Sequence, residues 1–145
     1  MFYIRQDYYL TLQKIYRVLP LFKKRPFLKD LIPEQFVDIH SHLLPGIDDG
    51  SKNIEMTVDL LRQMKDLRFS QFITTPHVTT GVWDNTREEI QAKFEETQQF
   101  LSSANHDFPL RVAAEYILDA NFTELLQHKK LLTLKDNLVL VEMSY

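Results

Sequence analysis

The chain contains no cysteine, and this absence excludes several kinds of chemistry at once. Disulfide bonds, thiolate metal sites and mechanisms that use a cysteine nucleophile are all ruled out. The chain also lacks any uninterrupted apolar run near the roughly 20 residues that span a bilayer. The overall composition is that of an ordinary globular protein, with 44% hydrophobic and 26% charged side chains. A length of 145 residues predicts one domain with a buried core.

Charge is unevenly distributed along the chain. Residues 1–30 carry seven basic and two acidic side chains, whereas the remainder is acidic and brings the total to −3. Apolar side chains stand near helical spacing in residues 2–22. The sequence therefore predicts a basic amphipathic extension at residues 1–33, followed by a domain at residues 34–145.

The basic extension does not match the usual membrane or nucleic-acid signatures. Lys14 and Arg17 interrupt the continuous apolar core that a signal peptide needs. A segment that packs on the domain is favoured over one that docks on acidic lipid. Lys23, Lys24 and Arg25 lack interleaved aromatic residues, so nucleic-acid binding is not expected.

After Pro33 the sequence alternates short apolar runs with amphipathic segments. The expected helices begin at Ser51 as N-cap, at a capping box formed by Thr86 and Glu89, and near residue 121 for a short helix 121–128. The expected strands are residues 36–40, 71–75, 110–114 and 138–141, of which the last is apolar throughout, as in a strand buried on both faces. This β-α-β-α-β-α-β order predicts an α/β fold with parallel strands, as a sheet or as part of a (β/α) barrel.

Two histidines, His40 and His42, stand two residues apart at the end of the first expected strand. On an extended strand such residues point to the same side, so both imidazoles can converge. Asp48 and Asp49 follow in an Asp-Asp-Gly turn and supply hard oxygen ligands. Imidazole and carboxylate without sulfur suit a divalent metal used for hydrolysis rather than structural zinc. The alternative is a surface strand with histidine at alternate positions, because such short motifs often arise by chance.

The other expected strands also end at or next to a metal-ligating side chain. His77 follows the second strand, Glu115 the third and Glu142 the fourth. Functional sites in parallel α/β folds lie at the C-terminal ends of the strands, where these side chains would meet. Four successive strand ends of this kind favour a metal site over the surface-strand alternative.

Several motifs resemble those of one known family. They are Asp38–His42, Leu44–Gly50, Thr75–His77, Ala113–Tyr116 and Val141–Tyr145. The chain resembles the PHP-type (polymerase and histidinol phosphatase) metallophosphatases, and within them the CpsB/CapC-type bacterial protein-tyrosine phosphatases found with capsule and exopolysaccharide genes. The resemblance covers about residues 20–145.

The resemblance implies the N-terminal half of a distorted (β/α) PHP-type barrel around three divalent metals, often manganese, with iron, magnesium or zinc as alternatives. His40 and His42 would hold the first metal, with Glu142 bridging toward the second. His77 and Glu115 would hold the third metal with an aspartate of the Asp-Asp-Gly turn. Asp48 is favoured as this ligand, and Asp49 is the alternative. A metal-bridging hydroxide would attack the phosphate, so no protein nucleophile would be needed.

The resemblance also implies that the family's barrel continues for roughly another hundred residues beyond Tyr145. That half would supply a His-Pro-Glu-Arg segment and a late Asp-x-His pair, so the 145-residue chain is expected to bind metal weakly and to be inactive alone. Its first and last strands would be open edges, which favours an oligomer or a complementing chain. The implied substrate is a phosphotyrosine protein, such as a bacterial tyrosine kinase, in the cytoplasm.

Two other functions stay open at this point. One is a non-catalytic half-barrel that binds a partner chain through its open edges. The other is a different PHP-type phosphoesterase, such as a histidinol phosphatase or a polymerase-associated nuclease. The Asp48-Asp49 turn and Glu142 argue against the latter, because those branches tend to place histidines at the equivalent points. Analogy of fold alone does not decide among these functions.

Overall fold

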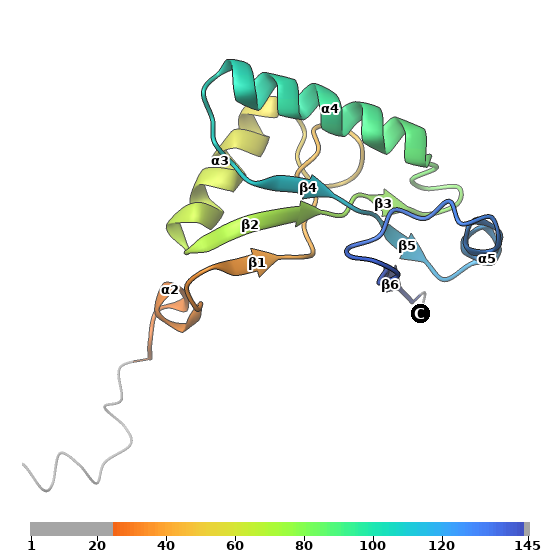
Figure 1. The fold of residues 1–145 in the computed structure, drawn as a ribbon, viewed down its shortest axis with the longest axis horizontal. Coiled ribbons are helices and arrows are strands. Elements are labelled where there is room, and N and C mark those ends of the chain that lie inside the picture. Colours follow the sequence, from red (N-terminus) through yellow and green to blue (C-terminus); the bar gives the residue numbers. More distant parts are fainter. Residues whose placement is uncertain (1–24, 144–145) are drawn as a thin grey trace, which may run out of the picture.

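The computed structural model describes residues 25–143, which form two parallel three-stranded sheets placed end to end (Figure 1). The first sheet has the order β1-β2-β4, with β1 at Phe36–Asp38, β2 at Phe69–Thr74 and β4 at Leu110–Val112. The second has the order β3-β5-β6, with β3 at His77–Val78, β5 at Glu115–Ile117 and β6 at Leu140–Glu142. The helices are α2 (Leu28–Leu31), α3 (Ile54–Asp66), α4 (Arg87–Ser103) and α5 (Ala120–Gln127). Parallel strands that alternate with helices confirm the predicted α/β class, whereas the helix predicted at 2–22 lies outside the described residues.

The expected strands 71–75 and 110–114 end at Thr74 and Val112, and each is followed by a short strand of the second sheet that the sequence pattern did not predict. Pro76 separates β2 from β3, and it has no N–H with which to continue a ladder. Across the gap, the N–H of Ala113 donates to the Thr74 carbonyl at 2.9 Å and the N–H of Glu115 to the Pro76 carbonyl at 3.0 Å. These bonds keep the interrupted strands side by side. As a result, His77 and Glu115 open the second sheet, and they lie opposite each other in its register.

Helices α3 and α4 cover one face of the first sheet (Figure 1). Both segments are amphipathic as expected, because Val58 and Leu61 of α3 and Leu101 of α4 are buried against Phe72 of β2. A second cluster, which includes Ile90 of α4, packs α4 and α5 against the second sheet. Burial of this apolar stripe is what fixes the helices over the strands.

The predicted N-cap of α4 is confirmed, whereas the predicted N-cap of α3 is not. Thr86 is the N-cap of α4 and forms the predicted capping box with Glu89. The N-cap of α3 is Asn53, whose side chain accepts from the N–H of Met56 at 2.9 Å, so the assignment to Ser51 was wrong. Ser51 is instead fully buried and its hydroxyl donates to the Asn53 carbonyl at 2.9 Å. The helix begins later because this buried serine belongs to the preceding loop.

Strands β1 and β6 are the outer strands of their sheets. Within residues 25–143, β1 pairs only with β2 and β6 only with β5, as the expectation of two open edges required. The prediction that residues 138–141 are buried on both faces was wrong, since Leu138 is 59% and Val141 40% exposed. No further strand of the described part lies beside β6 to cover them. None of the helices in this part is both long and apolar enough to cross a bilayer.

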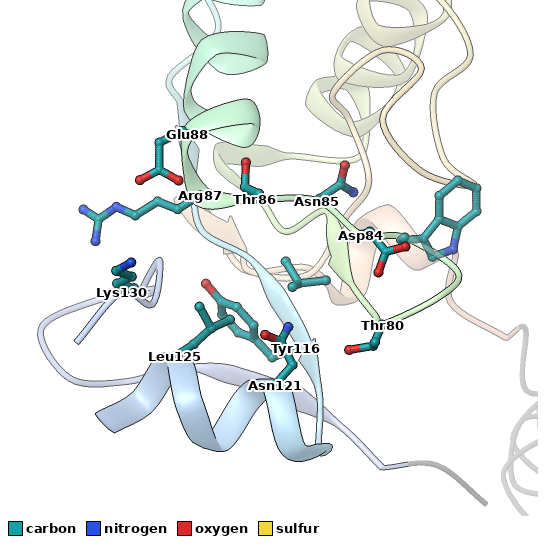
Figure 2. Close-up of a pocket in the computed structure, with 12 residues that line it drawn as sticks. Thr80, Asp84, Asn85, Thr86, Arg87, Glu88, Tyr116, Asn121, Leu125 and Lys130 are labelled. Atoms are coloured by element: carbon teal, nitrogen blue, oxygen red, sulfur yellow. The ribbon is translucent and has the colours of Figure 1, made fainter. Parts of the chain in front are cut away.

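A cavity of about 370 Å³ lies between the second sheet and helices α4 and α5 (Figure 2). Its lining includes Val78, Tyr116, Asn85, Arg87 and Lys130. Val78 and Tyr116 directly follow the two residues that open β3 and β5, and successive strand side chains point to opposite faces. The cavity therefore lies on the face of the second sheet away from the candidate metal ligands.

Candidate metal centre

Six of the seven side chains singled out in the sequence meet at the junction of the two sheets. They fall into three overlapping groups whose ligand atoms lie within 4.8 Å of one another. The groups are His40, His42 and Glu115; His42, Asp49 and His77; and His77, Glu115 and Glu142. Residues more than 100 positions apart are thus brought together by the parallel strand order.

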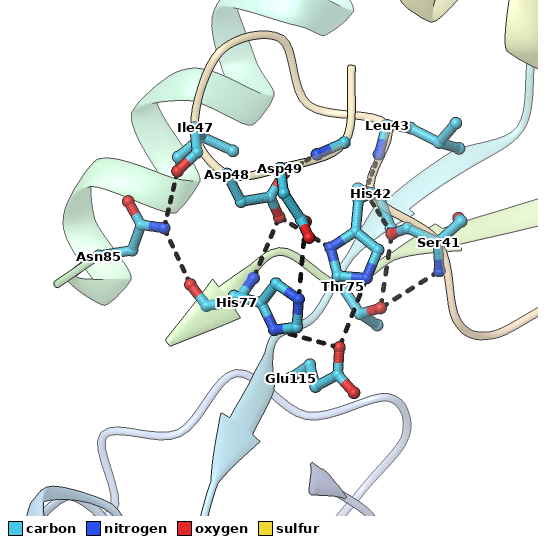
Figure 3. Close-up of polar contacts among 12 residues, drawn as sticks. Ser41, His42, Leu43, Ile47, Asp48, Asp49, Thr75, His77, Asn85 and Glu115 are labelled. Atoms are coloured by element: carbon cyan, nitrogen blue, oxygen red, sulfur yellow. Dashed lines mark hydrogen bonds and ion pairs between the residues drawn. The ribbon is translucent and has the colours of Figure 1, made fainter. Parts of the chain in front are cut away.

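The carboxylate of Glu115 belongs to two of these three groups (Figure 3). Its Oε2 lies 3.1 Å from Nε2 of His40, 3.4 Å from Nε2 of His42 and 3.4 Å from Nδ1 of His77. The Glu115 side chain is only 6% exposed. A buried carboxylate surrounded by imidazole nitrogens has to be matched by positive charge, either from protons or from a cation.

The two aspartates of the turn play different parts in the structure. The Asp48 side chain is fully buried, and its carboxylate accepts hydrogen bonds from Nδ1 of His42 at 2.8 Å, the Gly50 N–H at 3.0 Å and the His77 N–H at 3.1 Å. The Asp49 side chain is 63% exposed, and its Oδ1 lies 3.6 Å from Nε2 of His77. Asp48 joins none of the three groups, whereas Asp49 does. The geometry therefore favours Asp49 as the ligand and gives Asp48 the task of orienting His42.

The pairing of His42 with Asp48 changes the pKa of both side chains. The hydrogen bond to Asp48 is the main cause that raises the pKa of His42 above 6.5, and burial of the ring opposes it. Burial acts to raise the pKa of Asp48, but the hydrogen bonds from His42, Gly50 and His77 outweigh it and hold this pKa below 3.8. With Nδ1 engaged by Asp48, His42 presents Nε2 to the Glu115 carboxylate, an arrangement typical of metal-ligating histidines.

The histidines of the first motif lie after β1, because that strand ends at Asp38 rather than at His40 as predicted. Their rings nevertheless converge, with centroids 5.7 Å apart. The turn behind them is tight, since a Cβ on Gly50 would lie 2.3 Å from both the Cβ and the carbonyl oxygen of His42. Only glycine fits at this close approach of two backbone segments.

Sequence reasoning missed the polar side chains that hold the ligand-bearing segments in place. The Asn85 amide donates to the carbonyls of Ile47 at 3.0 Å and of His77 at 2.8 Å (Figure 3). The Thr74 hydroxyl donates to the Ser41 carbonyl at 3.0 Å and accepts from the Leu43 N–H at 2.9 Å. None of these residues belongs to a spacing pattern that would mark it as functional, so only the three-dimensional arrangement reveals them.

The donor set fits divalent metal ions. It offers imidazole nitrogens and carboxylate oxygens, with three exposed or half-exposed groups around the buried Glu115. Mixed nitrogen and oxygen ligands suit Mn²⁺, Fe²⁺ or Zn²⁺ better than they suit Ca²⁺, which prefers sites made of oxygen ligands alone. Without a metal ion, the His42 ring would have to carry a proton on each nitrogen to donate to both Asp48 and Glu115.

Fold and site together define an α/β protein with a histidine and carboxylate cluster at the ends of parallel strands. Residues 36–145 match the family described as capsular polysaccharide synthesis, CpsB/CapC, and the chain belongs to this family. It is 31% identical over 111 residues to the tyrosine-protein phosphatase CpsB of Streptococcus pneumoniae, which covers 74% of this chain and 45% of that protein. It is 27% identical over 112 residues to the tyrosine-protein phosphatase YwqE of Bacillus subtilis, covering 75% and 43%.

A solved structure shares the fold of this chain. It comes from crystal structures of YwqE from Bacillus subtilis and CpsB from Streptococcus pneumoniae, described as unique metal-dependent tyrosine phosphatases. The TM-score is 0.67 at 23% identity, and the match covers 76% of this chain and 45% of the other. The chain thus spans less than half the length of these relatives.

The stability of the metal-free chain should depend on pH through His42 and Asp48. The raised pKa of His42 gives stabilisation that is complete below 6.5 and is lost as pH rises through the raised value. The lowered pKa of Asp48 gives stabilisation that is present above 3.8 and is lost as pH falls through the lowered value. In the presence of a metal chelator, the difference in unfolding free energy between the wild type and Asp48→Asn should be largest between pH 3.8 and pH 6.5. A difference that does not vary with pH, measured by urea unfolding, would contradict the ion pair.

Proposed function

We propose that this chain carries part of a metal-dependent phosphomonoester hydrolase that acts on phosphotyrosine in proteins. The observation that carries the proposal is the convergence of three histidines on the buried carboxylate of Glu115, with Asp49 and Glu142 beside them. Membership of the CpsB/CapC family and the names of the relatives support the phosphatase reading and the link to capsular polysaccharide. A role in the cytoplasm, on a substrate such as a tyrosine kinase, is part of the proposal.

The three groups suggest how the ligands are shared. His40 and His42 form one group with Glu115, and His77 and Glu142 form another, so Glu115 would be shared by two metal positions. Asp49 would join His42 and His77 at a further position. This division gives Glu115 the bridging part that the resemblance assigned to Glu142. Bound divalent ions would supply positive charge that polarises a phosphate and makes water more acidic.

The chain's own residues would bind and orient in this reaction. The three imidazoles and Glu115 would hold the ions, and Asp48 orients His42 so that its Nε2 faces the Glu115 carboxylate. Because His40, Asp49 and Glu142 are exposed, a phosphate could reach the cluster from solvent. The absence of cysteine agrees with hydrolysis that forms no phosphoenzyme through a thiol.

The proposed architecture is the N-terminal half of a distorted PHP-type barrel. In the first sheet β1, β2 and β4 lie next to one another in parallel, and in the second sheet β3, β5 and β6 do so. That order supports a partial phosphatase domain at residues 34–145, with residues 1–33 as an extension. Manganese is the metal to test first, since nitrogen and oxygen ligands without sulfur accept it.

A chimera tests the proposed activity directly. Residues 36–145 would replace the corresponding segment of Streptococcus pneumoniae CpsB, and hydrolysis of a phosphotyrosine peptide would be followed with and without Mn²⁺. We expect Mn²⁺-dependent hydrolysis that His42→Ala reduces by at least about a hundredfold, because one ligand of two groups is lost. His128→Ala, an exposed histidine at the end of α5, should leave the rate unchanged. A folded chimera without activity, beside an active parent, would contradict the proposal.

The two aspartates should separate into a ligand and an orienting residue. Asp49→Asn should weaken Mn²⁺ binding to the 145-residue chain by about tenfold or more, yet leave the unfolding free energy within about 0.5 kcal/mol, since the side chain is exposed. Asp48→Asn should cost about 1–3 kcal/mol of stability because a buried acceptor of three hydrogen bonds is lost. Isothermal titration and urea unfolding measure the two effects. The opposite pattern would make Asp48 the ligand.

A second candidate function is a half-barrel that binds a partner chain. The observation in its favour is apolar exposure at both open edges, with Phe36 and Ile39 at β1 and Val141 and Met143 at β6. Unpaired parallel edges of this kind readily take up another chain. We expect the 145-residue chain to form a stoichiometric assembly in sedimentation experiments, and Val141→Lys to weaken it. A monodisperse monomer at micromolar concentration would count against this function.

A further inference from the structure

The segments that carry the metal ligands are held in place by different kinds of bond: some by strand pairing and others by side chains. His77 and Glu115 open β3 and β5, and the parallel ladder fixes their separation. Asp49 lies in the turn after Ile47, and its segment is outside both sheets. The distance of 3.6 Å between Asp49 and His77 therefore depends on side chains that join the turn to β3.

Two side chains make that junction. The Asp48 carboxylate accepts from the His77 N–H at 3.1 Å, while the Asn85 amide donates to the His77 carbonyl at 2.8 Å. Both backbone polar groups of His77 are thus bound by side chains. The same Asn85 nitrogen also donates to the Ile47 carbonyl at 3.0 Å, one residue before Asp48 (Figure 3). A single amide group therefore ties the turn to the strand.

The chemistry at this position requires an amide nitrogen. An amide NH₂ has two donors, and both are used here on carbonyl oxygens. A carboxylate of the same shape would place a negative oxygen against two carbonyls. The orientation of the amide is also determined, because its oxygen in that place would face two acceptors.

Asn85 is itself held firmly. It directly precedes Thr86, the N-cap of α4, whose N–H donates to Glu89 at 2.9 Å and whose hydroxyl accepts from the Glu89 N–H at 3.2 Å. Asp84, on its other side, accepts from the Gly81 N–H at 2.7 Å. The start of a 17-residue helix thus serves as the fixed point from which Asn85 reaches the site.

We propose that Asn85 is a positioning residue that sets the separation of Asp49 and His77, and so controls metal binding at the group they share with His42. This inference rests on the proposed metal site. Asn85 touches no ligand atom and acts only through the backbone of Ile47 and His77. Asn85 also lines the cavity of Figure 2.

The test compares two matched substitutions of an amide by a carboxylate. Asn85→Asp removes the two hydrogen bonds that the Asn85 amide donates to Ile47 and His77. Gln98→Glu removes a bond of the same kind farther along α4, where the Gln98 amide donates to the Leu110 carbonyl at 2.8 Å, away from the ligands. Co²⁺ is titrated into the 145-residue chain, and its visible absorption reports both affinity and coordination geometry. Thermal unfolding is measured for every variant.

Asn85→Asp should weaken Co²⁺ binding by about tenfold and alter the absorption spectrum, as loss of a group behind metal ligands typically does. Gln98→Glu should lose a similar amount of thermal stability but keep the affinity and the spectrum. Asn85→Ala serves in the same comparison if Asn85→Asp does not fold. An Asn85 variant with wild-type affinity and spectrum would overturn the proposal.

Hydrogen exchange of the metal-free chain separates this inference from the metal site. If the wild type binds no Co²⁺, the proposed metal site fails, and the exchange of the Gly50 and His77 amides judges the junction alone. Both amides donate to Asp48, so their exchange should become at least tenfold faster in Asn85→Asp and stay unchanged in Gln98→Glu. Unchanged exchange in Asn85→Asp would show that Asn85 does not position the turn.

Discussion

The buried carboxylate of Glu115 is the group on which the arrangement of the site depends. A carboxylate at 6% exposure is stable only if charge or hydrogen bonds compensate for the lost water. Here the nearest groups to its Oε2 are nitrogens of His40, His42 and His77. His42 faces Asp48 through Nδ1 and Glu115 through Nε2, so one neutral ring cannot donate to both carboxylates. Glu115 opens β5, directly after the interruption between β4 and β5, and pairs with His77 at the start of the second sheet.

The matching interruption between β2 and β3, at Pro76, organises the backbone around the site. Pro76 ends one ladder, yet its carbonyl accepts from the Glu115 N–H at 3.0 Å, so the two strands stay in register while a new sheet begins. His77 is thereby fixed opposite Glu115, and the turn after His42 has to be joined to it by side chains. Asp48, Asn85 and the close approach at Gly50 perform that task. Ligand geometry here is set largely by groups that bind no metal.

Much of this arrangement could be predicted from the sequence, since periodicity reports local structure well. The stripe of Val58 and Leu61 and the capping box at Thr86 placed two helices within a few residues. The rule that parallel strands bring their C-terminal ends together gathered His40, His77, Glu115 and Glu142. These features depend on spacing along the chain or on strand order alone.

What the sequence could not predict depends on contacts between distant segments. The carboxylates of Asp48 and Asp49 are chemically identical and adjacent, and only burial against His42 and His77 distinguishes them. The bonds of Asn85 span 38 and 8 positions, with no local pattern to mark them. The apolar run at 138–141 predicted a buried strand, whereas exposure of β6 depends on what lies beside it. The family resemblance implied both the ligands and their division among three metals, whereas two of the three groups in the structure share Glu115.

The exposure of the ligands indicates where the cluster is least complete. Glu115, His42 and His77 are largely buried, whereas the side chains of His40 and Glu142 are 52% and 47% exposed. His40 follows β1 and Glu142 ends β6, so two of the three exposed ligands stand at the outer strands β1 and β6. A polypeptide segment that paired with both edges would reach both ligands and would bury the apolar side chains there. Completion of the sheets and completion of the metal coordination would then be the same event, which couples folding to metal affinity.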